Sequence, residues 1–218
     1  MKYEKQVNKS HYGFERYFHK ARWMSYWYQS REIISRPEIK SVLDIGPGTD
    51  FLRSILTIHR PDITYHSLDL AADIKPDILG SVTRMPLPDA SYDVVCAFQV
   101  LEHIEFKDFE LAIAEMKRVS KRYLFISLPH ASPSVRFQIK IPMMPQFQIA
   151  VRFPFSKKHV FNGEHYWEIG KRGYSPNKIR KILESQLTLH DEYVPYENQY
   201  HHFYIGKVLQ AEKGLSSH

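Results

Sequence analysis

The chain has few of the residues on which disulfide-stapled or membrane-embedded proteins depend. Its 218 residues include one cysteine, Cys96, so no internal disulfide can form. Cys96 lies in an apolar run, where a thiol acts as a small buried hydrophobe. No apolar stretch approaches the roughly 18 residues that cross a bilayer, and the charged N-terminus does not resemble a secretion signal. We therefore expect a cytoplasmic protein without a membrane span.

Acidic residues are absent from one long segment. Residues 130–163 contain five Lys or Arg and no Asp or Glu, and the whole chain has a formal charge of +6. This balance suits an anionic partner such as RNA, a phosphorylated sugar or an acidic membrane surface. The overall composition, 43% hydrophobic and 25% charged, is that of a globular domain that can bury a sizeable core.

Strand and helix patterns alternate from residue 41 to residue 129. This alternation predicts a parallel sheet with crossover helices. The nearly continuous apolar runs at 94–98 and 123–126 predict central strands that are covered on both faces. The expected strands are 41–45, 63–68, 92–98, 123–128, 187–194 and 200–208, and the expected helices are 50–58, 106–119 and 176–185.

The remaining segments divide the chain into a main domain with attachments. Residues 37–211 form the main domain, and 212–218 read as a flexible tail. Residues 1–36 hold nine aromatic residues and predict a helix that either packs on the domain or covers a cofactor as a lid. The stripe expected to pack is Tyr17, Ala21, Met24 and Tyr28.

An insertion at 130–164 interrupts the main domain. Apolar residues alternate on both sides of a proline-rich connection at 142–146, which predicts an amphipathic hairpin. A short helix starting at Pro133 is the alternative, because proline is favoured at a first helical position. Either form would cap a substrate pocket.

A glycine turn follows the first predicted strand. Gly46 and Gly48 let a ligand approach the backbone at the carboxyl end of that strand. Phe51 stands where a dinucleotide fingerprint needs its third glycine, so a hydride-transfer enzyme is disfavoured. Asp69 closes the next strand at the separation at which a carboxylate accepts both hydroxyls of a ribose.

Three segments together resemble a known family. VLDIGPGTDFL, HSLDL and MPLPDASYDVVCAFQVLEHI are similar to class I S-adenosylmethionine-dependent methyltransferases, in particular to the quinone-methylase-like branch. The resemblance implies an α/β fold, a Rossmann-like three-layer sandwich with a seven-stranded, mostly parallel sheet, and S-adenosylmethionine as cofactor. The residues it places around the cofactor are Asp44, Gly46 and Gly48 on the methionine side, Asp69 at the ribose, Ser81, Val82 and Met85 at the adenine, and Leu70, Phe98 and Gln99 beside them.

The chain departs from the family pattern at two positions. Asp50 replaces the last glycine of the usual G-x-G-x-G loop, and we expect it to cap the helix that begins at Phe51. Ser81 stands where an aspartate often meets the adenine amine, and a hydroxyl accepts that hydrogen bond less strongly.

Candidate catalytic residues follow the 92–98 strand. Gln99, Glu102 and His103 lie near the expected position of the methyl group, and His103 is the candidate general base. The alternative is that Glu102 and His103 only cap the following helix. Some related enzymes bind a divalent metal through E-x-x-E-H, but Gln99 replaces the first glutamate, so we expect no metal.

A second candidate cluster lies at 163–170. His165 and Glu168 are three residues apart and share one face if the segment is helical, as a base and its orienting carboxylate. The alternative is a folded joint held by buried Trp167. The roles of His201 and His202 stay open.

The predicted activity is methyl transfer to an O, N or C nucleophile of a small-molecule or saccharide-like acceptor. An RNA methyltransferase is one alternative, since the insertion combines aromatic residues with positive charge. A non-catalytic protein that binds S-adenosylmethionine is another, because a fold does not determine a function. The sequence leaves the oligomeric state open.

Overall fold

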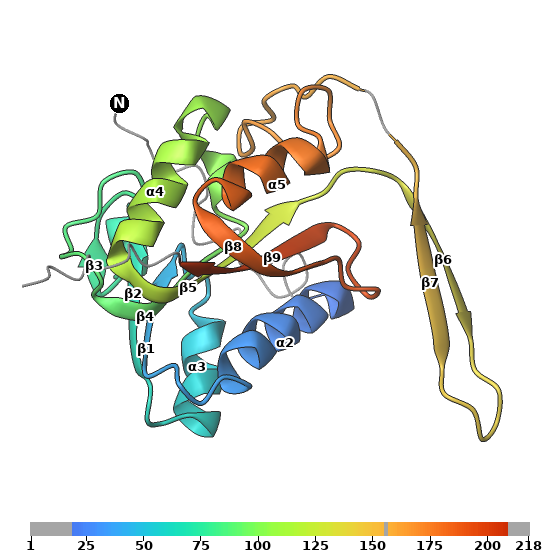
Figure 1. Ribbon diagram of the computed structural model, residues 1–218, viewed down its shortest axis with the longest axis horizontal. Helices are drawn as coiled ribbons and strands as arrows, with labels where there is room; N and C mark the ends of the chain where they lie inside the picture. The colour runs from blue at the N-terminus through green and yellow to red at the C-terminus, as the bar shows by residue number, and fades with distance from the viewer. Residues whose placement is uncertain (1–18, 155–156, 209–218) are drawn as a thin grey trace, which may run out of the picture.

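The computed structural model describes residues 19–154 and 157–208 and places a seven-stranded sheet at their centre (Figure 1). The strand order is β3-β2-β1-β4-β5-β9-β8. Neighbours from β3 to β5 are parallel, whereas β9 is antiparallel to both β5 and β8. The strands are β1 Ser41–Ile45, β2 Thr64–Asp69, β3 Ile78–Leu79, β4 Tyr92–Phe98, β5 Ser120–Pro129, β8 Leu187–Tyr193 and β9 His201–Val208.

Helices cover both faces of the sheet. Helices α2, Lys20–Ile34, and α3, Phe51–His59, lie on one side, and α4, Phe109–Val119, and α5, Pro176–Glu184, lie on the other (Figure 1). Three short 3₁₀ helices, Ala72–Ile74, Leu101–His103 and Phe106–Asp108, complete the described helical elements. This is the predicted Rossmann-like three-layer sandwich.

Strand β4 shows how the two faces become buried. Val94 and Cys96 pack into the apolar cluster under α2 and α3, whereas Val95 and Ala97 pack into the cluster under α4 and α5. All four side chains are fully buried. Because successive strand residues point to opposite faces, a strand covered on both faces needs a continuous apolar run, as the sequence predicts.

Helix α2 packs on the domain mainly through residues outside the predicted stripe, although Tyr28 of the stripe also contacts Tyr193 and Phe203. Tyr26 is buried, and its ring lies 4.6 Å from the ring of Phe51 on α3. Ser25 is also buried and accepts a hydrogen bond from Asn198. Of the predicted stripe, Ala21, Met24 and Tyr28 are only half-buried, and Tyr17 lies outside the described residues. The buried face of the helix is therefore rotated from the predicted one. It includes polar residues such as Ser25, which form hydrogen bonds with the β8–β9 connection.

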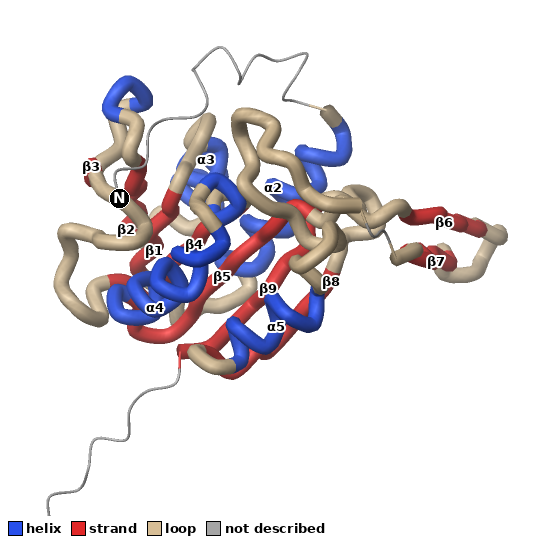
Figure 2. The backbone as a smooth tube through the Cα atoms, turned by 90° about the horizontal axis from the view of Figure 1, so that it is seen from above, coloured by secondary structure: helices blue, strands red, loops and turns tan. Residues whose placement is uncertain are grey.

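The insertion forms a hairpin that projects from the main domain (Figures 1 and 2). Strand β6, Ser134–Ile139, pairs antiparallel with β7, Phe147–Arg152. The predicted hairpin is confirmed, and the alternative short helix from Pro133 is wrong. None of the described helices is long and apolar enough to cross a membrane. The predicted tail at 212–218 lies outside the described residues.

Candidate active site

The glycine turn brings backbone, rather than side chains, to the carboxyl end of β1. Gly46 and Gly48 have φ values of 65° and 57°, which suit glycine. A Cβ atom at Gly46 would lie 2.6 Å from a methyl of Val100, just beyond the end of β4. The turn therefore closes tightly against β4. The Thr49 hydroxyl oxygen is buried here without a hydrogen-bond partner among the described residues.

Asp50 does not perform the predicted capping. It precedes α3 as expected, but its φ of 56° is left-handed and its side chain makes no capping hydrogen bond. The carboxylate instead pairs with Arg53 and accepts from the hydroxyl of Tyr65. The backbone at position 50 thus keeps the conformation that glycine usually supplies, while the side chain joins a charged network on β2 and α3.

Asp44 is a buried acid at the centre of that network. The Tyr65 hydroxyl lies 2.6 Å from one of its oxygens. Burial raises the pKa of Asp44 to about 7, and the nearby charges of Asp50 and Asp69 add to this rise against the lowering by Tyr65 and Arg53. Asp44 therefore changes its charge near neutral pH, at the strand end that faces the glycine turn.

Asp69 stands at the carboxyl end of β2, one strand away from Asp44. One of its oxygens accepts from the backbone N–H of Ala71 at 2.8 Å. The following segment is tied back to it, because the N–H of Gly80 donates to the carbonyl of Asp69 at 2.9 Å. Leu70 beside it is exposed. This end of the sheet is therefore shaped by backbone hydrogen bonds between adjacent segments.

The residues predicted to border the adenine come next along the chain. Val82 and Met85 are buried in the apolar cluster under α4 and α5. The Ser81 hydroxyl lies 2.8 Å from that of Thr83, so it already has a local partner. These positions are contiguous with Gly80 and hence with the Asp69 end of β2.

The end of β4 carries Phe98 and Gln99. Gln99 has a φ of 59°, an uncommon value for a residue with a side chain and one that clusters at functional sites. Its backbone N–H donates to the carbonyl of Ser127 on β5, and its side-chain amide lies 3.3 Å from the hydroxyl of the same serine. Phe98 is half-buried and lies 6.1 Å, ring to ring, from Phe203 on β9.

Glu102 is a fully buried acid in the 3₁₀ helix after β4. Neither carboxylate oxygen has a hydrogen-bond partner among the described residues. Burial raises its pKa to about 7, against the lowering influence of His165. An unpartnered buried carboxyl group costs stability, and such groups are kept where they serve a site. The alternative role, a cap on the following helix, finds no support in its side-chain contacts.

His103 and His165 meet beside Glu102, although they are far apart in the sequence. Their ring centroids lie 5.0 Å apart at an angle of 78°. His103 Nδ1 lies 2.8 Å from the carbonyl of Glu164, so this nitrogen carries a proton and the neutral ring has its lone pair on Nε2. The structure thus brings all three predicted catalytic side chains together.

His165 is oriented by an acid and a phenol. Its Nδ1 lies 2.8 Å from Glu168, and the Tyr200 hydroxyl donates to the same carboxylate oxygen at 2.7 Å. Burial lowers the pKa of His165, but the hydrogen bond to Glu168 and the charges of Glu102, Glu168 and Glu164 outweigh burial and raise it. The predicted base and orienting carboxylate therefore form a pair, in an irregular rather than a helical segment.

The same segment is also a packed joint. Trp167 is fully buried, and its indole N–H donates to the carbonyl of Ile104 at 3.1 Å. The N–H of Tyr166 donates to the carbonyl of Glu102 at 2.9 Å. The predicted His165–Glu168 pair and the predicted joint around Trp167 are therefore compatible, because the buried tryptophan fixes the segment that carries His165.

Three of these side chains have metal-ligand geometry. Glu102, His103 and His165 each place one ligand atom within 4.8 Å of the other two. A carboxylate and two imidazoles are ligands that divalent transition metals accept. The same closeness also suits proton transfer, so the expectation of no metal stays a prediction. His201 and His202 lie on β9 and are buried, and burial lowers the pKa of both.

Three polar residues of this region are not singled out by the sequence pattern. Thr49 lies in the glycine turn, Tyr65 contacts Asp44 from within β2, and Tyr200, the residue just before β9, reaches Glu168. The only sequence signal for Thr49 is its place between Gly48 and Asp50. Tyr65 and Tyr200 carry no local signal, because their partners lie 21 and 32 residues away.

Comparison with known proteins agrees with this geometry. Residues 43–125 match the family model of a methyltransferase domain. A search of curated proteins finds no match. The matched residues run from β1 to β5 and so contain the glycine turn, Asp69 and the end of β4.

Solved structures with the same fold include several methyltransferases. The N-methyltransferase NodS from Bradyrhizobium japonicum, solved with S-adenosylhomocysteine, is 10% identical with a TM-score of 0.59, covering 94% of this chain and 95% of that one. A SAM-dependent methyltransferase from Aquifex aeolicus is 15% identical with a TM-score of 0.57, covering 93% and 100%. The 1,6-didemethyltoxoflavin-N1-methyltransferase of Burkholderia thailandensis is 12% identical with a TM-score of 0.56, covering 85% and 77%. Identities this low show a shared fold.

The match over residues 43–125 and the fold agree with each other. The strand order with an antiparallel β9 is that of the class I fold, and the matched segment holds the residues at the carboxyl ends of β1, β2 and β4. Residues 43–125 are thus similar to a methyltransferase domain, and the sheet that contains them has the fold of the methyltransferases compared above.

Proposed function

We propose that the chain transfers a methyl group to an O, N or C nucleophile of a small-molecule or saccharide-like acceptor. The observation that carries this proposal is the meeting of Glu102, His103 and His165 just beyond the end of β4. Such a cluster supplies a proton acceptor at the place where an acceptor molecule would meet the methyl group. The proposal concerns the acceptor and the residues that serve it.

The residues at the ends of β1 and β2 fit S-adenosylmethionine. The buried hydroxyl of Thr49, which has no hydrogen-bond partner in the described part of the chain, is suited to the carboxylate of the methionine part. Asp44 and Asp69 suit a ligand with an ammonium, a sulfonium and ribose hydroxyls, and no phosphate is present to be repelled. The assigned positions are Asp44, Gly46 and Gly48 at the methionine part, Asp69 and Leu70 at the ribose, Ser81, Val82 and Met85 at the adenine, and Phe98 and Gln99 at the end of β4.

The cofactor supplies a methyl group on a sulfonium, which is a good leaving group, so the chain mainly aligns the acceptor and takes up its proton. His165 accepts this proton on Nε2, because Glu168 holds its Nδ1–H. The carboxylate stabilises the imidazolium that forms. Tyr200 fixes Glu168 in turn, which keeps the imidazole plane in one orientation.

Glu102 and His103 support His165 from the other side. His103 presents Nε2 because its Nδ1 donates to the carbonyl of Glu164. Glu102, with a pKa of about 7, exists in both charge states near neutral pH and contributes charge to His165 when it is ionised. We assign His165 as the base and His103 as a residue that contacts the acceptor, while Glu102 lies buried beside them.

The acceptor class is supported by two considerations. The Burkholderia thailandensis neighbour was solved with the small molecule 1,6-didemethyltoxoflavin, so the fold accommodates a small acceptor there. In this chain Glu102 is buried and His103 and His165 are half-buried, which suits a small group better than a polymer. The resemblance to the quinone-methylase-like branch stays a prediction, and no comparison favours that branch.

The test has two stages. Calorimetry with S-adenosylmethionine and S-adenosylhomocysteine measures cofactor binding by the wild type, and we expect binding of both. The protein is then incubated with S-adenosylmethionine labelled on its methyl group, with small-molecule extract and total RNA in separate reactions. Label in the small-molecule fraction supports the proposed acceptor, and label in RNA alone overturns it.

Two further outcomes of the same experiment are decisive. Cofactor binding without transfer to either fraction favours the non-catalytic alternative and contradicts the proposed activity. Each transfer reaction is repeated after treatment with EDTA. Unchanged transfer supports His165 as a base that acts without a metal, whereas a loss that Zn²⁺ or Mn²⁺ restores replaces that role with metal ligation by Glu102, His103 and His165.

A further inference from the structure

The projecting hairpin exposes a continuous apolar face. Val135 pairs with Val151, Phe137 with Ile149, and Ile139 with Phe147, so six apolar side chains lie on one face of the two strands. Each is 43% to 59% exposed. A run of large apolar side chains this long on the surface of one element marks an interaction site.

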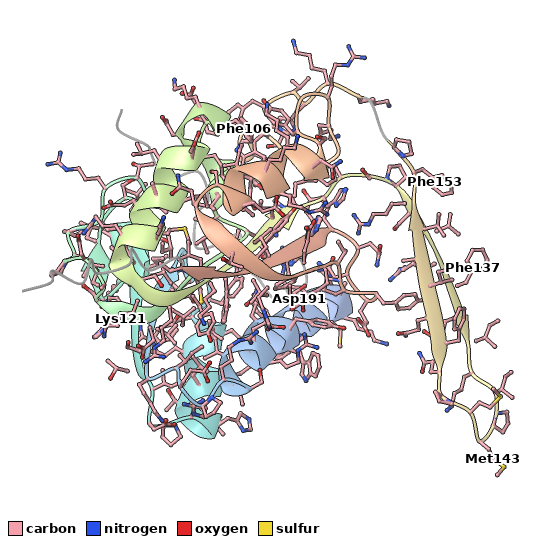
Figure 3. The ribbon with its side chains drawn as sticks, viewed as in Figure 1. Phe106, Lys121, Phe137, Met143, Phe153 and Asp191 are labelled. Atoms are coloured by element: carbon pink, nitrogen blue, oxygen red, sulfur yellow. The ribbon has the colours of Figure 1, made fainter. Side chains whose placement is uncertain are left out.

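The opposite face of the hairpin is polar and is fastened to the domain. Arg136 donates to the carbonyls of Tyr196 and Glu197, and Arg152 donates to the carbonyl and side chain of Gln199. These contacts hold the root of the polar face against the β8–β9 connection. The apolar face is consequently turned outward, as the position of Phe137 in Figure 3 shows. This is the reverse of the usual arrangement, in which an amphipathic element buries its apolar face on the domain.

The tip continues the apolar surface. Met143 lies at the end of the hairpin farthest from the domain (Figure 3) and is fully exposed. Ile141 and Met144 beside it are at least half exposed. Methionine is unbranched and adapts to irregular apolar surroundings, so this tip suits a fluid apolar environment better than a rigid binding pocket.

The root of the hairpin is basic. A pocket of about 780 Å³ opens where β7 meets the segment before α5. None of the described residues that line it is acidic, and the Nη1 atom of Arg152 is buried without a hydrogen-bond partner in the described part of the chain. The cationic side chains of the lining are Arg152, Lys171, Arg172 and Lys178.

We propose that this hairpin docks the protein onto a bilayer surface that carries anionic headgroups. The apolar face and the Met143 tip enter the boundary between headgroups and acyl chains, and the cations of the root meet the phosphates. The proposed contact is a surface contact, and none of the described helices is long and apolar enough to cross a membrane. Phe153 connects the apolar face with the basic root, because it belongs to the exposed apolar surface and also lines the pocket.

Charge favours a lipid surface over a second copy of the chain. A symmetric contact between two hairpins would bring two cationic segments together, and residues 130–163 contain no acidic residue to balance them. An anionic headgroup layer provides that balance over the whole root. This proposal goes beyond methyl transfer and does not depend on the acceptor.

The test is co-sedimentation of the purified chain with vesicles of phosphatidylcholine alone or mixed with phosphatidylglycerol, without cofactor. The wild type should bind the anionic vesicles at least about tenfold more strongly than the neutral ones, and less strongly as salt rises. The double variant Phe137→Ser/Ile149→Ser should lower binding at least about tenfold. The matched control is Gln138→Ser/Gln148→Ser, a neighbouring cross-strand pair on the polar face, which should change binding less than about twofold.

A second variant separates charge from burial of apolar surface. Arg172→Gln/Lys178→Gln should reduce binding to anionic vesicles about tenfold and leave binding to neutral vesicles unchanged. Thermal unfolding of every variant verifies that it is folded. Equal binding of the wild type and the Phe137/Ile149 variant would overturn the proposal. So would light scattering that shows a dimer without lipid which the same variant dissociates, or displacement from the vesicles by millimolar inorganic phosphate.

Discussion

The proposed cofactor side and the proposed acceptor side of the site are assembled in different ways. On the cofactor side, Asp44, Gly46 and Asp69 come from adjacent strand ends in one short stretch, and Asp44 lies opposite Ser67 in the β1–β2 register. On the acceptor side, His103 contacts Glu164 across 61 residues, and Tyr200 reaches Glu168 across 32. Backbone geometry shapes the first side, and side-chain hydrogen bonds around a buried acid shape the second.

Because of this difference, a substitution on one side should leave the function of the other side intact. Damage to a strand-end carboxylate removes ligand contacts but leaves the hydrogen bonds among His165, Glu168 and Tyr200 intact. Damage to His165 removes a proton acceptor but leaves the glycine turn unchanged. The predictions below use variants that affect one side and test whether the other side responds.

The largest expected effect is the loss of turnover in His165→Gln. If His165 accepts the proton of the acceptor, kcat should fall about 100-fold to 1,000-fold, because general base catalysis contributes on this scale. Binding of S-adenosylhomocysteine, measured by calorimetry, should change less than about twofold, since the cofactor side is untouched.

The control for this variant is His190→Gln, which changes an exposed histidine on β8. It should leave both measurements unchanged. A His165→Gln variant that keeps its turnover would contradict the assignment of the base. A variant that loses cofactor binding as well would show that the two sides are coupled.

A smaller effect, on the other side, is expected for Asp69→Ala. If the Asp69 carboxylate accepts the ribose hydroxyls as proposed, its loss should weaken binding of S-adenosylhomocysteine at least about tenfold, since hydrogen bonds to a charged group are worth about 1.5 to 3 kcal/mol each. Calorimetry provides the measurement. Asp191→Ala, an exposed acid on β8, is the matched control, and unchanged affinity in Asp69→Ala would refute the ribose assignment.

The smallest change is a pKa shift in Glu168→Gln. The carboxylate of Glu168 keeps the pKa of His165 above its ordinary value against burial, which lowers it. Without that charge the pKa of His165 should fall, so the imidazole should lose its proton at lower pH than in the wild type. NMR titration of the histidine ring protons measures this directly. A rise, or no shift relative to the exposed control Glu110→Gln, would show that Glu168 does not set the basicity of His165.

The fold was predictable from the sequence where buried residues recur in the pattern typical of a strand or a helix. The run at 94–98 gives a central strand, and the alternation on both sides of 142–146 gives the hairpin. Helix α5 begins at Pro176, and its first turn is capped by Ser175, whose hydroxyl accepts from the N–H of Lys178. In these places local preference and tertiary packing demand the same structure.

Prediction from the sequence failed where the position of a side chain depends on a partner far away in the chain. Helix α2 buries polar residues such as Ser25, because Asn198 supplies a hydrogen bond that no helical period reveals. Asp50 adopts a left-handed backbone that a residue with a side chain rarely takes, and its carboxylate turns to Arg53 instead of capping α3. Glu168 and Tyr200 meet only because β9 runs antiparallel to β5, which brings Tyr200 next to the end of β5.

The single cysteine is a chemical probe of how often the core of the protein opens. Cys96 is fully buried in β4, between β1 and β5, and burial raises the pKa of its thiol well above the usual value. A thiol reagent can reach it only when the centre of the sheet opens. The rate of labelling therefore reports how often the core comes apart, free of background from any second thiol.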